Sequence, residues 1–127
     1  MTPRFVLDTG ALISAERGKP RGLRFFRLAH AGLATLIVPL PVVAEWWRGR
    51  SRLRDELLAS TRIVASVEAA KAAGVALARL RGVDAGLTID AMVMATAALL
   101  DAVVVTGDRA DLARLADHFP GVPILSA

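Results

Sequence analysis

Short apolar runs rich in β-branched residues alternate with helical patterns along the chain, and this alternation constrains the fold most strongly. The clearest run is 102–105, Ala-Val-Val-Val, which is uncharged and dominated by valine, as expected for a buried strand. Runs at 4–7, 36–38, 62–65 and 122–125 also predict strands. Strands that alternate with helices predict an α/β fold, here a three-layer α/β/α sandwich around a mainly parallel central sheet.

Helical patterns fill the segments between these runs. We expect helices over 9–17, 21–31, 41–48, 52–59, 68–80, 88–100 and 108–118. The segment 88–100 is apolar on nearly every face, which predicts a helix buried at the centre. Thr88 could serve as the N-cap of this helix, which would put Asp90 in its first turn. A length of 127 residues without a linker or repeat predicts one domain over 1–127.

Composition argues against several classes of protein. The chain has no cysteine, which excludes disulfides, thiolate metal sites and cysteine nucleophiles and suits a reducing compartment. The longest uncharged stretch, 31–44, is interrupted by Pro39 and Pro41 and is too short to cross a bilayer. The first residues also lack the apolar region of a signal peptide. We therefore expect a cytoplasmic protein without a membrane partner.

Basic residues are concentrated in two short segments. The net charge is +4, and nine of the sixteen lysines and arginines are Arg17, Lys19, Arg21, Arg24, Arg27, Arg48, Arg50, Arg52 and Arg54. Such clustering is expected for a protein that binds a polyanion such as RNA. An acidic protein partner would explain the clusters equally well, and arginine-rich composition alone would explain the net charge.

Four acids lie where a divalent cation could be bound. Asp8 directly follows the first predicted strand and Asp108 follows the valine run, and ligands of parallel α/β sheets bind beyond the carboxyl ends of strands. Asp90 and Glu45 lie in apolar helical segments, where an uncompensated carboxylate is costly unless it faces a cleft or a cation. Converging carboxylates repel one another, and an oxygen-only donor set suits Mg²⁺ or Mn²⁺ rather than zinc.

Each acid taken alone is more often structural, and the helical acids have local alternatives. Asp90 near a helix N-terminus would be favoured by the helix dipole. Arg48 lies three residues after Glu45 and could pair with it along the helix. Trp46 and Trp47 could stack on an unpaired base, but adjacent tryptophans beside a buried helix more often serve the core or a dimer interface.

Four segments resemble, in order and spacing, the motifs of the PIN-domain family. They are 6–13 (VLDTGALI), 41–45 (PVVAE), 90–97 (DAMVMATA) and 104–112 (VVTGDRADL). The set resembles the VapC-type toxins of bacterial toxin–antitoxin pairs over essentially the whole chain. This resemblance implies a PIN-like fold and an endoribonuclease that needs Mg²⁺ or Mn²⁺. It also implies a homodimer that is silenced by a cognate VapB-type antitoxin.

Carried over by position, the resemblance implies a catalytic and metal-binding set of Asp8, Glu45, Asp90 and Asp108, with Thr106 as a supporting hydroxyl. We interpret Asp111 first as a first-turn residue of the last long helix, and second as an assisting acid. Gly10 stands where many family members carry Ser or Asn, so a side-chain contact near the metal is expected to be missing. The implied reaction is hydrolysis of RNA with one or two ions, while the arginine clusters follow the backbone.

Other classes stay open. A receiver-type signalling module is also α/β with acids at strand ends, although Asp8 has no adjacent acid and the only lysines are Lys19 and Lys71. A degenerate PIN-like domain that only binds RNA or a protein is the second alternative, and intact acids at all four positions argue against it. A dinucleotide-binding enzyme is weaker, because no Gly-x-Gly-x-x-Gly motif follows the first strand. The sequence identifies neither the RNA target nor the antitoxin.

Overall fold

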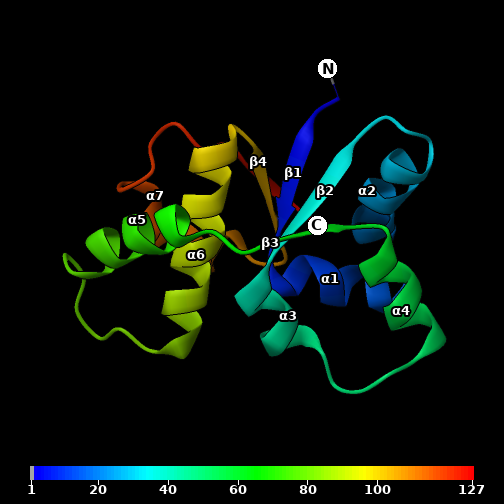
Figure 1. Ribbon diagram of the computed structural model, residues 1–127, viewed down its shortest axis with the longest axis horizontal. Helices are drawn as coiled ribbons and strands as arrows, with labels where there is room; N and C mark the ends of the chain where they lie inside the picture. Colours follow the sequence, from blue (N-terminus) through cyan, green and yellow to red (C-terminus); the bar gives the residue numbers. More distant parts are fainter. Residues whose placement is uncertain (1) are drawn as a thin grey trace.

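A five-stranded parallel sheet forms the centre of the computed structural model, which describes residues 2–127 (Figure 1). The strands are β1 (Arg4–Leu7), β2 (Thr35–Pro39), β3 (Arg62–Val64), β4 (Val103–Thr106) and β5 (Ile124–Ser126). Their order across the sheet is β3-β2-β1-β4-β5, and every neighbouring pair is parallel. The predicted parallel sheet is confirmed.

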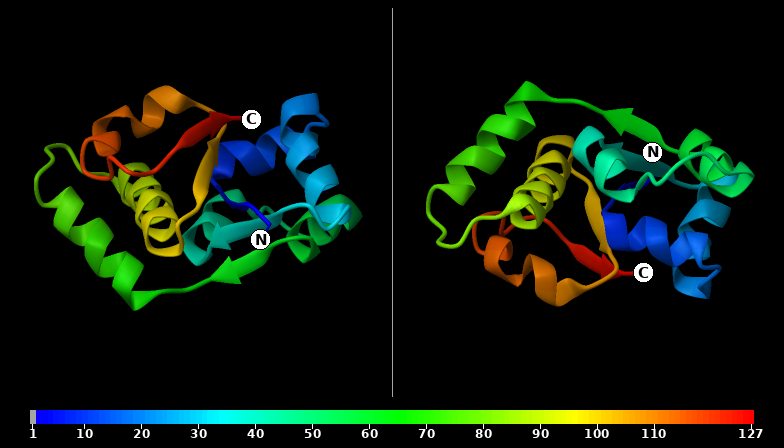
Figure 2. Two further views of the ribbon diagram at one scale, coloured as in Figure 1. Left: turned by 90° about the horizontal axis from the view of Figure 1, so that it is seen from above. Right: turned by 90° about the horizontal axis from the view of Figure 1, so that it is seen from below.

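Helices cover both faces of the sheet, so the three-layer architecture is also confirmed (Figures 1 and 2). The helices are α1 (Thr9–Glu16), α2 (Pro20–His30), α3 (Leu40–Trp46), α4 (Arg52–Ala59), α5 (Val67–Leu77), α6 (Ala85–Leu100), the 3-10 helix η1 (Arg109–Leu112) and α7 (Ala113–Ala116). The pair α1 and α2 covers one face, whereas α6 covers the other and contacts β1, β2 and β4. Helix α5 packs against α6, and α3 contacts both α1 and α6.

The central strands are apolar because both faces of the sheet are covered. Val6, Val38 and Val104 have no exposed surface, as expected for a parallel sheet between two helical layers. The edge strand β3 differs, since Arg62 and Ile63 are exposed. Among residues 2–127, no helix is long and apolar enough to cross a membrane.

The central helix starts earlier than the sequence predicts. Helix α6 begins at Ala85, and Asp84 is its N-cap because the Asp84 Oδ1 atom accepts the Leu87 N–H at 2.8 Å. The prediction of Thr88 as N-cap is wrong, and its hydroxyl donates to the Asp84 carbonyl oxygen at 2.9 Å. Asp90 therefore lies in the second turn, where the helix dipole favours an acid less strongly.

The last long helix predicted over 108–118 does not form as one helix. It is replaced by the 3-10 helix η1 and the one-turn helix α7. Asp108 caps η1, and Leu112 and Leu115 are both fully buried. Leu112 ends η1 and Leu115 lies in α7, so the buried side of this segment continues across both short helices.

Candidate active site

The candidate site lies at the carboxyl edge of the sheet, between β1 and β4. The chain leaves β1 toward β2 and later returns to β4 on the other side, so the strand order reverses here, and such switch points are where α/β sheets bind ligands. Val6 pairs with Val104 and Leu7 with Val105, and the Asp8 N–H donates to the Val105 carbonyl at 3.1 Å. The segments that follow both strands therefore meet.

Asp8 is buried, with 7% of its surface exposed, and its carboxylate accepts three hydrogen bonds. The Oδ1 atom accepts the backbone N–H of Ala11 at 2.8 Å and of Gly107 at 3.2 Å, and Oδ2 accepts the Thr106 hydroxyl. Burial raises the pKa of the Asp8 carboxyl above its usual value, and these three hydrogen bonds lower it. Asp8 thus caps α1 and ties it to the loop after β4.

Thr106 connects Asp8 to Asp108. Its fully buried hydroxyl donates to the Asp8 Oδ2 atom and accepts the Asp108 N–H at 3.1 Å. The Asp108 Oδ1 atom accepts the Ala110 N–H at 2.9 Å and so caps η1. The hydroxyl expected to support the acids therefore touches Asp8 directly and Asp108 through its backbone.

Glu45 contacts α1 rather than its own helix. Its Oε1 atom accepts the hydroxyl of Thr9, the first residue of α1. Arg48 donates instead to the carbonyl oxygens of Ala44 at 3.3 Å and Trp47 at 2.8 Å. The ion pair with Glu45 that the helical spacing would allow is not among those formed by residues 2–127. No local spacing in the sequence indicates the Thr9 contact.

Asp90 lies where several carboxylates act on one another. It is half-buried on α6, and its pKa is raised to about 7 by burial first, and then by the charges of Asp8, Asp111, Glu45 and Asp84. Repulsion between carboxylates is strongest at short distances, and it raises the pKa of a carboxyl group that has ionised neighbours. The structure therefore gathers three of the four predicted acids, Asp8, Glu45 and Asp90, in one electrostatic environment.

Asp111 belongs to the same environment, whereas the sequence interpretation favoured a plain helical role for it. Its charge raises the pKa of both Asp8 and Asp90. Asp108 is exposed, and its Oδ1 atom is used to cap η1. The only sequence signal for Asp111 is its position three residues after Asp108, on the segment that forms η1.

The donor chemistry of these residues fits a hard divalent cation. In the part of the chain that the structure describes, no three His, Cys, Asp or Glu side chains are arranged closely enough to enclose an ion. The carboxylates are held instead by the hydroxyls of Thr9 and Thr106 and by backbone N–H groups. The ion pairs of residues 2–127 involve other acids. The negative charge of the cluster is thus unbalanced, and Mg²⁺ or Mn²⁺ would balance it.

The raised pKa of Asp90 predicts how the stability of the metal-free protein depends on pH. The folded pKa of about 7 exceeds the ordinary aspartate pKa of 3.8, so the folded state holds an extra proton at pH values between the two. Stability should therefore fall as pH rises from about 4 to about 7. In EDTA, we expect a lower melting temperature at pH 8 than at pH 5, and a smaller difference for Asp90→Asn. Identical pH profiles for the two proteins would contradict this.

The all-parallel sheet with carboxylates at its switch point defines an α/β protein with an acidic site at the carboxyl edge. The PIN domain model matches residues 5–118, and the chain belongs to the PIN-domain family. None of the curated proteins compared with it matches significantly. The fold is similar to that of a chain in the crystal structure of VapBC2 from Rickettsia felis bound to a DNA fragment from their promoter, with a TM-score of 0.68, 16% identity and 98% of each chain covered. It is also similar to PAE2754 from Pyrobaculum aerophilum, with a TM-score of 0.60, 19% identity, and 98% of this chain and 92% of that chain covered.

The strand order also addresses the receiver alternative. Flavodoxin-like folds have the order 2-1-3-4-5, whereas this sheet has the order β3-β2-β1-β4-β5. A receiver-type module therefore does not fit the structure.

Proposed function

We propose that this chain is a metal-dependent endoribonuclease that hydrolyses RNA phosphodiester bonds, and that residues 1–127 act as one nuclease domain. The observation that carries the proposal is the acidic site at the switch point, where the buried Asp8 carboxylate is fixed by three hydrogen bonds. Burial, followed by the charges of Asp8, Asp111, Glu45 and Asp84, raises the pKa of Asp90 to about 7. Titratable groups perturbed by burial and by specific neighbours are typical of functional sites. An oxygen-only cluster of this kind suits Mg²⁺ or Mn²⁺.

Each residue of the site has a proposed role. Asp8 and Asp90 would hold the cation, with Glu45 and Asp108 as further ligands. Thr106 keeps the Asp8 carboxylate oriented through its hydroxyl, as outer partners of metal ligands commonly do. A bound cation would lower the pKa of a coordinated water and neutralise charge on the scissile phosphate. The chain itself supplies orientation, because three hydrogen bonds fix the Asp8 carboxylate before any substrate arrives.

We further propose that the chain is the toxin of a VapBC-type pair, a cytoplasmic homodimer silenced by a VapB-type antitoxin. Full-length similarity to the chain in the VapBC2 structure supports this role. We expect a short reading frame directly upstream, whose product co-purifies with the chain and blocks RNA cleavage. A chain without such a neighbour would instead be a solitary RNA-processing nuclease.

Removal of metal is expected to abolish the activity reversibly. The purified protein should cleave single-stranded RNA in Mg²⁺ or Mn²⁺, lose cleavage in excess EDTA, and regain it when either ion is restored. Gel analysis of an end-labelled RNA measures this directly. Equal cleavage with and without EDTA would refute the carboxylate mechanism. A folded protein that binds RNA in Mg²⁺ or Mn²⁺ without cleaving it would be the non-catalytic PIN-like module instead.

A further inference from the structure

The two basic segments of the chain differ once they are folded. In the second segment, Arg50 pairs with Asp55, Arg52 with Glu56 and Arg54 with Glu16, so most of its charge is neutralised. The first segment, from Arg17 to Arg27, is exposed at all five of its basic residues and makes no ion pair within residues 2–127. Of the two segments, the first therefore keeps its positive charge free, and Arg48 is the unpaired member of the second.

A groove of about 250 Å³ connects the acidic cluster to this free charge. It lies among α1, α3 and α4, and the residues that matter for its chemistry are Glu16, Arg17, Glu45, Trp46, Arg48 and Arg54. Glu45, a proposed metal ligand, thus lines the same groove as three arginines. We call this feature the α1–α3–α4 groove.

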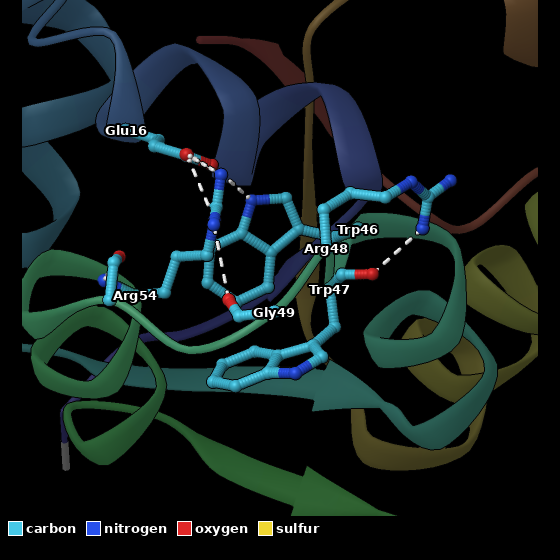
Figure 3. Close-up of polar contacts among 7 residues, drawn as sticks. Glu16, Trp46, Trp47, Arg48, Gly49 and Arg54 are labelled. Atoms are coloured by element: carbon cyan, nitrogen blue, oxygen red, sulfur yellow. Dashed lines mark hydrogen bonds and ion pairs between the residues drawn. The ribbon is translucent and has the colours of Figure 1, made fainter.

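One acid of the groove is already neutralised by a fixed network (Figure 3). The Glu16 Oε1 atom accepts the Trp46 Nε1–H at 2.9 Å, and Oε2 accepts the Arg54 Nε–H at 3.0 Å. The Glu16 and Arg54 side chains are each 25% exposed, so this pair is better shielded from solvent than the other two. Trp46 is only 3% exposed, which makes it part of the core rather than a surface for stacking a base.

Arg17 and Arg48 are the groove cations that stay available. Arg17 is exposed at the C-cap of α1. Arg48 uses one guanidinium nitrogen for the carbonyls of Ala44 and Trp47, and its remaining nitrogens make no hydrogen bond within the described chain. In Figure 3 the Arg48 guanidinium points away from the Glu16 network. Two guanidinium groups with free donors suit a phosphate, which they bind in a forked geometry.

We propose that the α1–α3–α4 groove binds a backbone phosphate of RNA next to the scissile phosphate, with Arg17 and Arg48 as its ligands. The inference rests on the proposed nuclease function. Arg54 neutralises Glu16, and a bound metal ion would neutralise Glu45. The free Arg17 and Arg48 therefore leave the groove positive when the enzyme holds its metal. With the Trp46 indole buried and hydrogen-bonded, the groove offers contacts to the RNA backbone, so its contribution should not depend on sequence.

Alanine substitutions test the groove against a matched control. Arg17→Ala and Arg48→Ala remove charge from it, whereas Arg4→Ala removes the same charge from an exposed position at the start of β1, at the opposite edge of the sheet. Kd for a 2′-O-methyl RNA and KM for cleavage are measured in Mg²⁺ at several salt concentrations. We expect Arg17→Ala and Arg48→Ala each to raise both constants about 5- to 10-fold with little change in kcat. Each should reduce the salt slope by about 0.7, the value for one lost contact to a single strand. Arg4→Ala should change Kd and KM less than about 2-fold.

The possible outcomes separate the groove from the proposed function. If wild-type protein binds and cleaves RNA but all three variants behave alike, the groove is not part of the RNA path and the inference is wrong. If the groove variants keep their RNA constants but lose binding of poly-glutamate, the site belongs to an acidic protein segment, which also overturns it. A folded wild-type protein that neither binds nor cleaves RNA would overturn the proposed function and the inference together. Melting temperatures of the three variants show that each is folded.

Discussion

Asp8→Asn is expected to lower RNA cleavage by more than about 100-fold while the fold stays intact, a loss above the 10- to 100-fold typical of outer partners of a metal site. The amide oxygen of asparagine can still accept the Ala11 and Gly107 N–H groups that now bind Oδ1. The Thr106 hydroxyl can turn to donate to the Asp108 carbonyl at 3.1 Å and accept from the new amide. Only the negative charge is lost, and that charge is what a cation would need.

Asp101→Asn is the matched control for this substitution. Asp101 is exposed at the C-cap of α6, before β4 and therefore at the opposite edge of the sheet, and its φ of 51° suits asparagine well. Cleavage of labelled single-stranded RNA in Mg²⁺ and the thermal transition by circular dichroism are measured for both variants. We expect Asp101→Asn to behave like the wild type in both. Wild-type cleavage by Asp8→Asn would exclude Asp8 as a metal ligand.

The sheet could be predicted from sequence because its strands are buried on both faces and so read as continuous apolar runs. The ends of helices could not be predicted as well, because more than one residue type suits each end. Asp84 and Thr88 are both good N-cap residues, and tertiary packing selects Asp84. The segment 108–118 has a helical pattern, but it begins as a 3-10 turn in which the Asp108 side chain accepts the Ala110 N–H two residues on.

The candidate site shows the same division between local and long-range information. Asp8 could be placed from sequence because it ends a strand. The local rule that pairs residues three or four apart on a helix offers Arg48 as a partner for Glu45, whereas Glu45 binds Thr9 from another element. The ion pair between Glu16 and Arg54 joins residues 38 apart, and no periodic pattern indicates such a contact. The site residues were therefore identified from their resemblance to a family more than from spacing.

Gly10 has a structural role that the family comparison alone did not suggest. A Cβ atom at Gly10 would lie 2.8 Å from the Cα atom of Gly107, and one at Gly107 would lie 2.7 Å from the Cα atom of Gly10. The two backbones touch, which brings the Gly107 N–H to the Asp8 Oδ1 atom at 3.2 Å. In this chain a larger residue at position 10 would displace the loop that helps to hold Asp8.

Gly107→Ala should therefore lower both stability and activity. The added methyl group must separate α1 from the loop after β4, at a cost of about 1–3 kcal/mol for such overpacking. It should also weaken the Gly107 contact to Asp8, and a displacement of about 1 Å at a catalytic group costs about 100-fold in rate.

Gly74→Ala is the control, because Gly74 lies in α5 with nothing within 4 Å of a Cβ. It should stabilise the protein by about 0.5–1 kcal/mol without changing cleavage. Urea midpoints and cleavage rates measure both effects. A loss of stability for Gly107→Ala together with a gain for Gly74→Ala would show that the close contact of the two backbones, and not the flexibility of glycine, holds the loop beside Asp8. A Gly107→Ala protein as stable and active as the wild type would show that the loop can move freely.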